Sequence, residues 1–81
     1  MGNEVRALSV IMKEVKAEWK KPYFGAVPYI EALSELNSSK DKYGMDDARS
    51  LVLYFLANSQ TWRGDTARRI KAELKQMADV K

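Results

Sequence analysis

The sequence contains an uninterrupted run of seven apolar residues, 51–57, and this run most restricts how the chain folds. A short apolar run fits either a buried strand or one part of a buried helix, so the flanking residues must decide. No Gly or Pro occurs from Met45 to Arg63, a window much longer than a typical strand of about 5–6 residues. We therefore predict a helix over residues 45–61, with the Asp46 carboxylate as its N-cap.

One face of this predicted helix is lined almost entirely by apolar side chains. Its members recur at helical spacing: Ala48, Leu51, Val52, Phe55, Ser59 and Trp62. Leu53 and Leu56 add apolar surface on other sides, and a helix of this kind needs neighbours on several sides. We expect three further helices to pack around it. The run is too short to span a bilayer, which takes about 20 apolar residues.

The three further helices are predicted at residues 4–20, 28–37 and 65–79 from their narrow apolar seams. The first seam consists of Val5, Leu8, Met12, Val15 and Trp19, the second of Ile30, Leu33 and Leu36, and the last of Ala67, Ile70, Leu74 and Met77. We predict an all-α fold, a compact four-helix domain with a central buried helix. All 81 residues are expected to form one domain, near the size at which a single core is only marginally sufficient.

Capping residues and prolines place the ends of these helices. Asn3 is a candidate N-cap for the first helix, and Pro22 prevents that helix from extending far beyond Lys21. Pro28 favours the start of the second helix. For the last helix two starts are open: Asp65 as N-cap after Gly64, or Thr61 as N-cap of a helix beginning at residue 62.

The absence of His and Cys excludes several kinds of chemistry. Without Cys there are no disulfides or thiolate metal sites, and without His the usual general base near neutral pH is missing. The four glycines are scattered and form no phosphate-binding loop. We expect no catalytic residues, no metal and no cofactor. Glu4 and Arg6 interrupt the N-terminus before any signal-peptide apolar region, so we expect a cytoplasmic protein.

Basic side chains follow one flank of the first helix and the matching flank of the last. The first set is Arg6, Lys13, Lys16 and Lys20, and the second is Arg68, Lys71 and Lys75. The opposite flanks carry Glu4, Glu14 and Glu18 in the first helix and Arg69 and Glu73 in the last. Charged flanks are the norm for surface helices, and a solvated face is the ordinary interpretation. The shared pattern is nevertheless the clearest functional hint in the chain.

Residues 21–29 are unusual because two prolines and a glycine surround two aromatic residues, Tyr23 and Phe24. Aromatic side chains in small domains mostly serve the core, so one interpretation is that both plug the end of the helical bundle. The alternative is that one packs near Trp19 while the other is an exposed anchor for a partner.

Residues 22–29, together with 54–58 and 61–64, resemble small all-helical proteins encoded by bacteriophages and prophages. The resemblance covers most of the chain. It implies a bacterial cytoplasmic setting and no assigned activity, so it transfers no site residue to this sequence.

Two functional hypotheses follow. The first is a non-enzymatic protein-binding module, adaptor or regulatory, whose partner contacts Tyr23, Phe24, Trp62 and Arg63, with self-association through a helix seam as a variant. The alternative is a DNA-binding protein that uses the last helix and its basic flank. Its candidate residues are Arg63, Thr66, Arg68, Arg69, Lys71 and Lys75.

Overall fold

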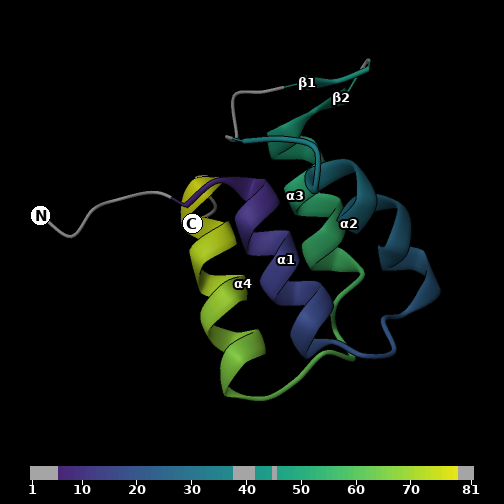
Figure 1. Ribbon diagram of the computed structural model, residues 1–81, viewed down its shortest axis with the longest axis vertical. Helices are drawn as coiled ribbons and strands as arrows, with labels where there is room; N and C mark the ends of the chain where they lie inside the picture. Colours follow the sequence, from purple (N-terminus) through teal and green to yellow (C-terminus); the bar gives the residue numbers. More distant parts are fainter. Residues whose placement is uncertain (1–5, 38–41, 45, 79–81) are drawn as a thin grey trace, which may run out of the picture.

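Four helices pack in a ring (Figure 1), and their buried apolar side chains form one core cluster. The computed structural model describes residues 6–37, 42–44 and 46–78, with the backbone alone for residues 42 and 43. The helices are α1 (Leu8–Glu18), α2 (Val27–Leu33), α3 (Ala48–Ala57) and α4 (Asp65–Met77), and the 3₁₀ turn η1 (Phe24–Ala26) leads into α2. The main contacts join α1 to α2, α2 to α3, α3 to α4 and α4 to α1. The prediction of an all-α fold with four helices is confirmed.

The predicted central helix begins later than expected because a short β-hairpin precedes it. Strands β1 (Lys42–Tyr43) and β2 (Asp46–Asp47) pair antiparallel and project beyond the end of α3 (Figure 1). The helix begins at Ala48, so the residue before it is the cap and the prediction of Asp46 as N-cap was wrong by one residue. Asp47 is the N-cap, and its carboxylate accepts a hydrogen bond from the Ser50 amide at 2.8 Å.

The predicted apolar face of α3 and the segment after it is buried. Its members are no more than 5% exposed: Ala48, Leu51, Val52, Phe55, Ser59 and Trp62. The polar member of this set, Ser59, donates its hydroxyl hydrogen to the carbonyl of Leu56 at 3.0 Å, so its burial leaves no unsatisfied group. The other seams are also inside where the structure describes them, except that Met77 is only partly buried. Ile11, which the first seam omitted, is fully buried as well.

Helix α1 begins where the chain that follows α2 can accept its first amide hydrogens. The amides of Leu8 and Ser9 donate to the carbonyls of Asn37 and Leu36 at 2.9 and 2.8 Å. These bonds satisfy donors that have no partner within the helix, and no side chain caps this end. Ala7 is the N-cap and Arg6 lies outside the helix, so the predicted start at residue 4 was wrong; the Asn3 cap itself lies outside the described residues.

The second helix is shorter at its C-terminal end than predicted. After Leu33 the amides of Glu35 and Leu36 bond to carbonyls three residues back, at 3.2 and 3.1 Å, so the chain tightens and leaves the α-helix. Leu36 still reaches the core.

Gly64 decides where α4 begins. It has a positive φ of 115°, which strongly favours glycine, and it serves as the N-cap. Asp65 is therefore the first helical residue and not the cap, and the alternative start at residue 62 is wrong. At the other end of the helix, Arg49 donates from Nε to the carbonyl of Ala78 at 2.7 Å, which satisfies a C-terminal acceptor.

Two tryptophans close one end of the ring. Trp19, the residue after α1, leaves the helical conformation and stacks on Trp62, with ring centroids 5.4 Å apart and planes 10° from parallel. The edge contact of Trp19 with Phe55, at 6.3 Å, joins this pair to the centre of the core. This stack explains why α1 ends at Glu18, two residues before the predicted end.

We expect Trp62→Ala to lower the free energy of unfolding by about 3–5 kcal/mol, because it leaves a cavity against Trp19 in the core. Denaturant unfolding followed by circular dichroism measures this. The matched aromatic control is Phe24→Ala. Its side chain is 79% exposed, and its removal should change stability by no more than about 0.5 kcal/mol. Equal losses in the two variants would contradict the assignment of the tryptophan stack to the core.

Candidate functional site

Tyr23 and Phe24 both lie on the surface, at the start of η1. Tyr23 is 44% exposed and Phe24 is 79% exposed, and their ring centroids are 4.8 Å apart. Neither plugs the end of the bundle, and neither takes the predicted place beside Trp19. The reason is steric: Trp62 already covers that face of Trp19. The chain then turns at once, since the Ala26 amide donates to the Tyr23 carbonyl at 2.8 Å.

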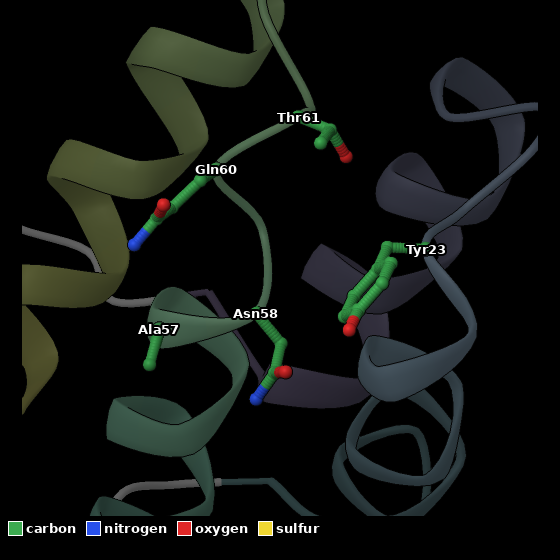
Figure 2. Close-up of a pocket in the computed structure, with 5 residues that line it drawn as sticks. All are labelled: Tyr23, Ala57, Asn58, Gln60 and Thr61. Carbon is green, nitrogen blue, oxygen red and sulfur yellow. The ribbon is translucent and has the colours of Figure 1, made fainter.

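A pocket of about 240 Å³ separates Tyr23 from the C-terminal end of α3. It is lined by Tyr23, Ala57, Asn58, Gln60 and Thr61. Figure 2 shows the Tyr23 ring on one side and Asn58 on the other, with Thr61 on the loop that follows α3. The Asn58 amide donates from Nδ2 to the carbonyl of Tyr54 at 2.8 Å, which holds this side chain at the helix end.

Gly25 keeps the two walls of this pocket close together. A Cβ atom at this position would lie 2.6 Å from Cε2 of Tyr23 and 2.9 Å from Oδ1 of Asn58. These distances are shorter than van der Waals contact. The absence of a side chain at Gly25 is therefore what allows the Tyr23 ring to lie against the backbone beside Asn58.

A second pair of aromatic side chains, Tyr29 and Tyr54, lies on α2 and α3. Tyr54 is 50% exposed, and its ring centroid lies 5.5 Å from that of the partly buried Tyr29. Tyr54 is one turn before Asn58, and its carbonyl accepts the hydrogen bond from this pocket residue. We call Tyr23, Phe24, Tyr29 and Tyr54 the aromatic surface. Tyr29 and Tyr54 were not among the residues predicted to contact a partner. For Tyr54 the only signal was its hydroxyl, the one side-chain polar group in the apolar run.

Trp62 does not belong to this surface. Its side chain is 5% exposed and stacked on Trp19. The prediction that it contacts a partner required an exposed side chain, and this one is buried. Arg63 is exposed and does not line the pocket behind Tyr23; it lines the groove described next.

A basic groove runs beside the first turns of α4. It has a volume of about 250 Å³ and is lined by Trp62, Arg63, Gly64, Arg68 and Lys71. Lys71 donates from Nζ to the carbonyl of Trp62 at 2.6 Å, which fixes the ammonium group at the groove. Burial lowers the pKa of Lys71, and the nearby charges of Lys75 and Arg63 lower it further. The groove therefore concentrates positive charge that lacks a close acidic partner among its lining residues.

The opposite flank of α4 faces α1, and its charges are paired there. Arg6 donates to both carboxylate oxygens of Glu73, at 2.9 and 2.6 Å, and to Glu14 at 2.9 Å, while Arg69 also donates to Glu14. These pairs show that α1 and α4 run antiparallel. Arg6 therefore joins the paired flank and not the basic flank to which it was assigned. Arg69 is engaged with Glu14, which removes it from the free cations of α4.

The two basic flanks lie on different sides of the molecule. Lys16 and Lys20 line a hollow of about 190 Å³ that also includes Val27, Ile30 and Glu31 of α2. Helix α1 contacts both α2 and α4, and its Glu14 flank faces α4. Its lysines therefore point away from Arg68, Lys71 and Lys75, and the matching charge pattern of the two helices does not form one continuous surface.

Within the described residues, no group of three or more acidic side chains is placed to hold a metal ion. In the same part of the chain, every helix is too short or too polar to cross a membrane. Comparisons with protein-family models, curated proteins and solved structures gave no match. The functional argument therefore rests on the geometry of the aromatic surface and the basic groove.

We expect acid to weaken the α1–α4 contact through Glu14. Hydrogen bonds from Arg69 and Arg6 lower the pKa of this carboxyl below its ordinary value of 4.5. When a carboxyl has a lower pKa in the folded state than in the unfolded state, it stabilises the fold at pH values above its unfolded-state pKa. This stability is lost as the pH falls through the folded-state pKa. Glu14→Gln should therefore be less stable than the wild type near neutral pH, with a smaller difference between them at about pH 3.

The measurement is denaturant unfolding at several pH values from about 7 to about 3. Glu35→Gln is the control, because Glu35 is an exposed glutamate that follows α2. Equal pH dependence for the wild type and Glu14→Gln would contradict the stabilising role of these ion pairs.

Proposed function

We propose that this protein is a non-enzymatic binding module that docks on another protein through its aromatic surface. The observation that carries the proposal is the exposure of Phe24 and Tyr23, two aromatic rings in contact with each other outside the core. A large apolar side chain left in water next to another is informative, whereas a single exposed apolar residue is ordinary.

The composition of the aromatic surface supports this role. Three tyrosines and one phenylalanine supply rigid, amphipathic contact area, and aromatic residues are enriched where binding energy concentrates. The pocket behind Tyr23 offers polar groups from Asn58 and Thr61 that fix the orientation of an inserted side chain.

The charges next to the aromatic surface indicate the kind of partner. Lys20 and Lys21, both exposed, immediately precede the Pro22 turn into η1. A segment that inserts an apolar side chain beside Phe24 and carries acidic residues at its edge would complement them. In the setting that the resemblance implies, this partner is a bacterial cytoplasmic protein and the module is phage-encoded. A second copy of this chain is the variant.

The double variant Tyr23→Ala/Phe24→Ala tests the proposal. A crosslinking amino acid is first placed at Phe24 to capture the partner in bacterial cells, and the captured protein is then purified. We expect the double variant to weaken binding by about 30-fold or more, the loss of about 2 kcal/mol that marks a binding hot spot. Isothermal titration calorimetry gives the dissociation constant, and sedimentation velocity tests self-association.

Val10→Ala is the matched control. Val10 is 47% exposed, close to the exposure of Tyr23, and lies on α1 outside the aromatic surface. It should bind like the wild type. If the double variant is folded and still binds with the wild-type dissociation constant, the aromatic surface is not the docking site.

A second substitution acts on the site without removing an aromatic ring. Gly25→Ala places a methyl group where it displaces the ring of Tyr23 and the side chain of Asn58, both of which can move into solvent. We expect a stability loss of about 1 kcal/mol or less, with weaker partner binding. Unchanged binding, with nuclear magnetic resonance showing that the Tyr23 ring has moved, would exclude the pocket from recognition.

A further inference from the structure

We propose that the basic groove beside α4 binds the phosphate backbone of a nucleic acid strand, without reading its bases. The groove shares no lining residue with the pocket behind Tyr23. This inference therefore goes beyond the protein-docking function and does not depend on it.

The cations of the groove form a row that Lys75, one turn beyond the lining residues, continues along α4. Arg68, Lys71 and Lys75 occur at helical spacing on one flank of α4, and Arg63 lies at the start of the row on the loop before the helix. With a rise of about 1.5 Å per residue, the seven positions from Arg68 to Lys75 span about 10.5 Å. That length exceeds a single phosphate group. It suits a polyanion with repeated charges, as in a nucleic acid strand.

Little negative charge competes for these cations among the described residues. Glu73 is turned toward α1, where Arg6 holds both of its oxygens. Asp65 lies 3.9 Å from Arg68, but both side chains are more than 80% exposed, so this pair is weak. The first turn of α4 adds unpaired amide hydrogens and the positive end of its dipole at the same end of the groove.

Base reading is not part of the inference. The connection between α3 and α4, residues 58–64, is longer than the turn of about 3–4 residues in a helix-turn-helix. Arg69 is paired with Glu14, and Thr66 is partly buried. The predicted recognition set is therefore reduced to the cations that suit phosphate: Arg63, Arg68, Lys71 and Lys75.

The test compares two triple variants that each remove three positive charges. One is Arg68→Gln/Lys71→Gln/Lys75→Gln on the groove, and the control is Lys13→Gln/Lys16→Gln/Lys20→Gln on the far flank of α1. Fluorescence anisotropy measures binding of a labelled DNA duplex and a labelled single strand from about 50 to 200 mM salt. Circular dichroism establishes that both variants are folded.

We expect wild-type affinity to fall steeply with salt. The groove variant should reduce the slope of log K against log salt on duplex by about 2.7, or about 0.9 for each lost phosphate contact, while the control changes it little. The single variant Arg68→Gln, at a side chain 82% exposed, should reduce it by about 0.9 and remains informative if the triple variant unfolds.

Three results would overturn the inference. The first is no binding of either nucleic acid at the lowest salt. The second is an equal loss of slope in the two triple variants, which means attraction by net charge alone. The third is equally tight binding of polyglutamate of matched charge and length, which means that the groove selects acidic polypeptides and not phosphates.

Discussion

The contact between Trp19 and Trp62 is the interaction on which the rest of the structure depends. Stacked aromatic rings contribute about 0.5–1.5 kcal/mol beyond the burial of their area, and this pair also touches Phe55 at the centre of the core. The contact joins the end of α1 to the segment that follows α3. It therefore holds two connections in place: the one that leads from α1 to η1, and the one that leads from α3 through Gly64 to α4.

The same contact explains why aromatic side chains are left outside. Trp62 occupies the position against Trp19, while Tyr23 and Phe24, at the start of η1, lie on the surface. A chain of 81 residues has little interior, so exposed rings reflect competition for a small core. We propose that a partner protein covers these rings.

Pairing between α1 and α4 divides the charges of the protein into two kinds. Arg6, Glu14, Arg69 and Glu73 neutralise one another along the contact of these two helices. The cations on the outer flank of α4 remain exposed to water, beside a groove that also holds the carbonyl-bonded Lys71. The modest net charge of +3 therefore conceals a concentrated basic region, since much of the acidic charge on these two helices is engaged elsewhere.

The sequence by itself determined the helical class, the number of helices and most of the core. The reason is that apolar spacing along a helix is local information: the stripe from Ala48 to Trp62 is buried as its periodicity predicts. The helix ends depended on groups distant in sequence, such as the carbonyls of residues 36 and 37 that cap α1. Only the tertiary structure decided which aromatics were exposed and which charges were paired. Trp62 is buried, Phe24 is exposed and Arg6 is paired with Glu73. These outcomes depend on which segments pack against each other, and the spacing of residues along the chain does not record that.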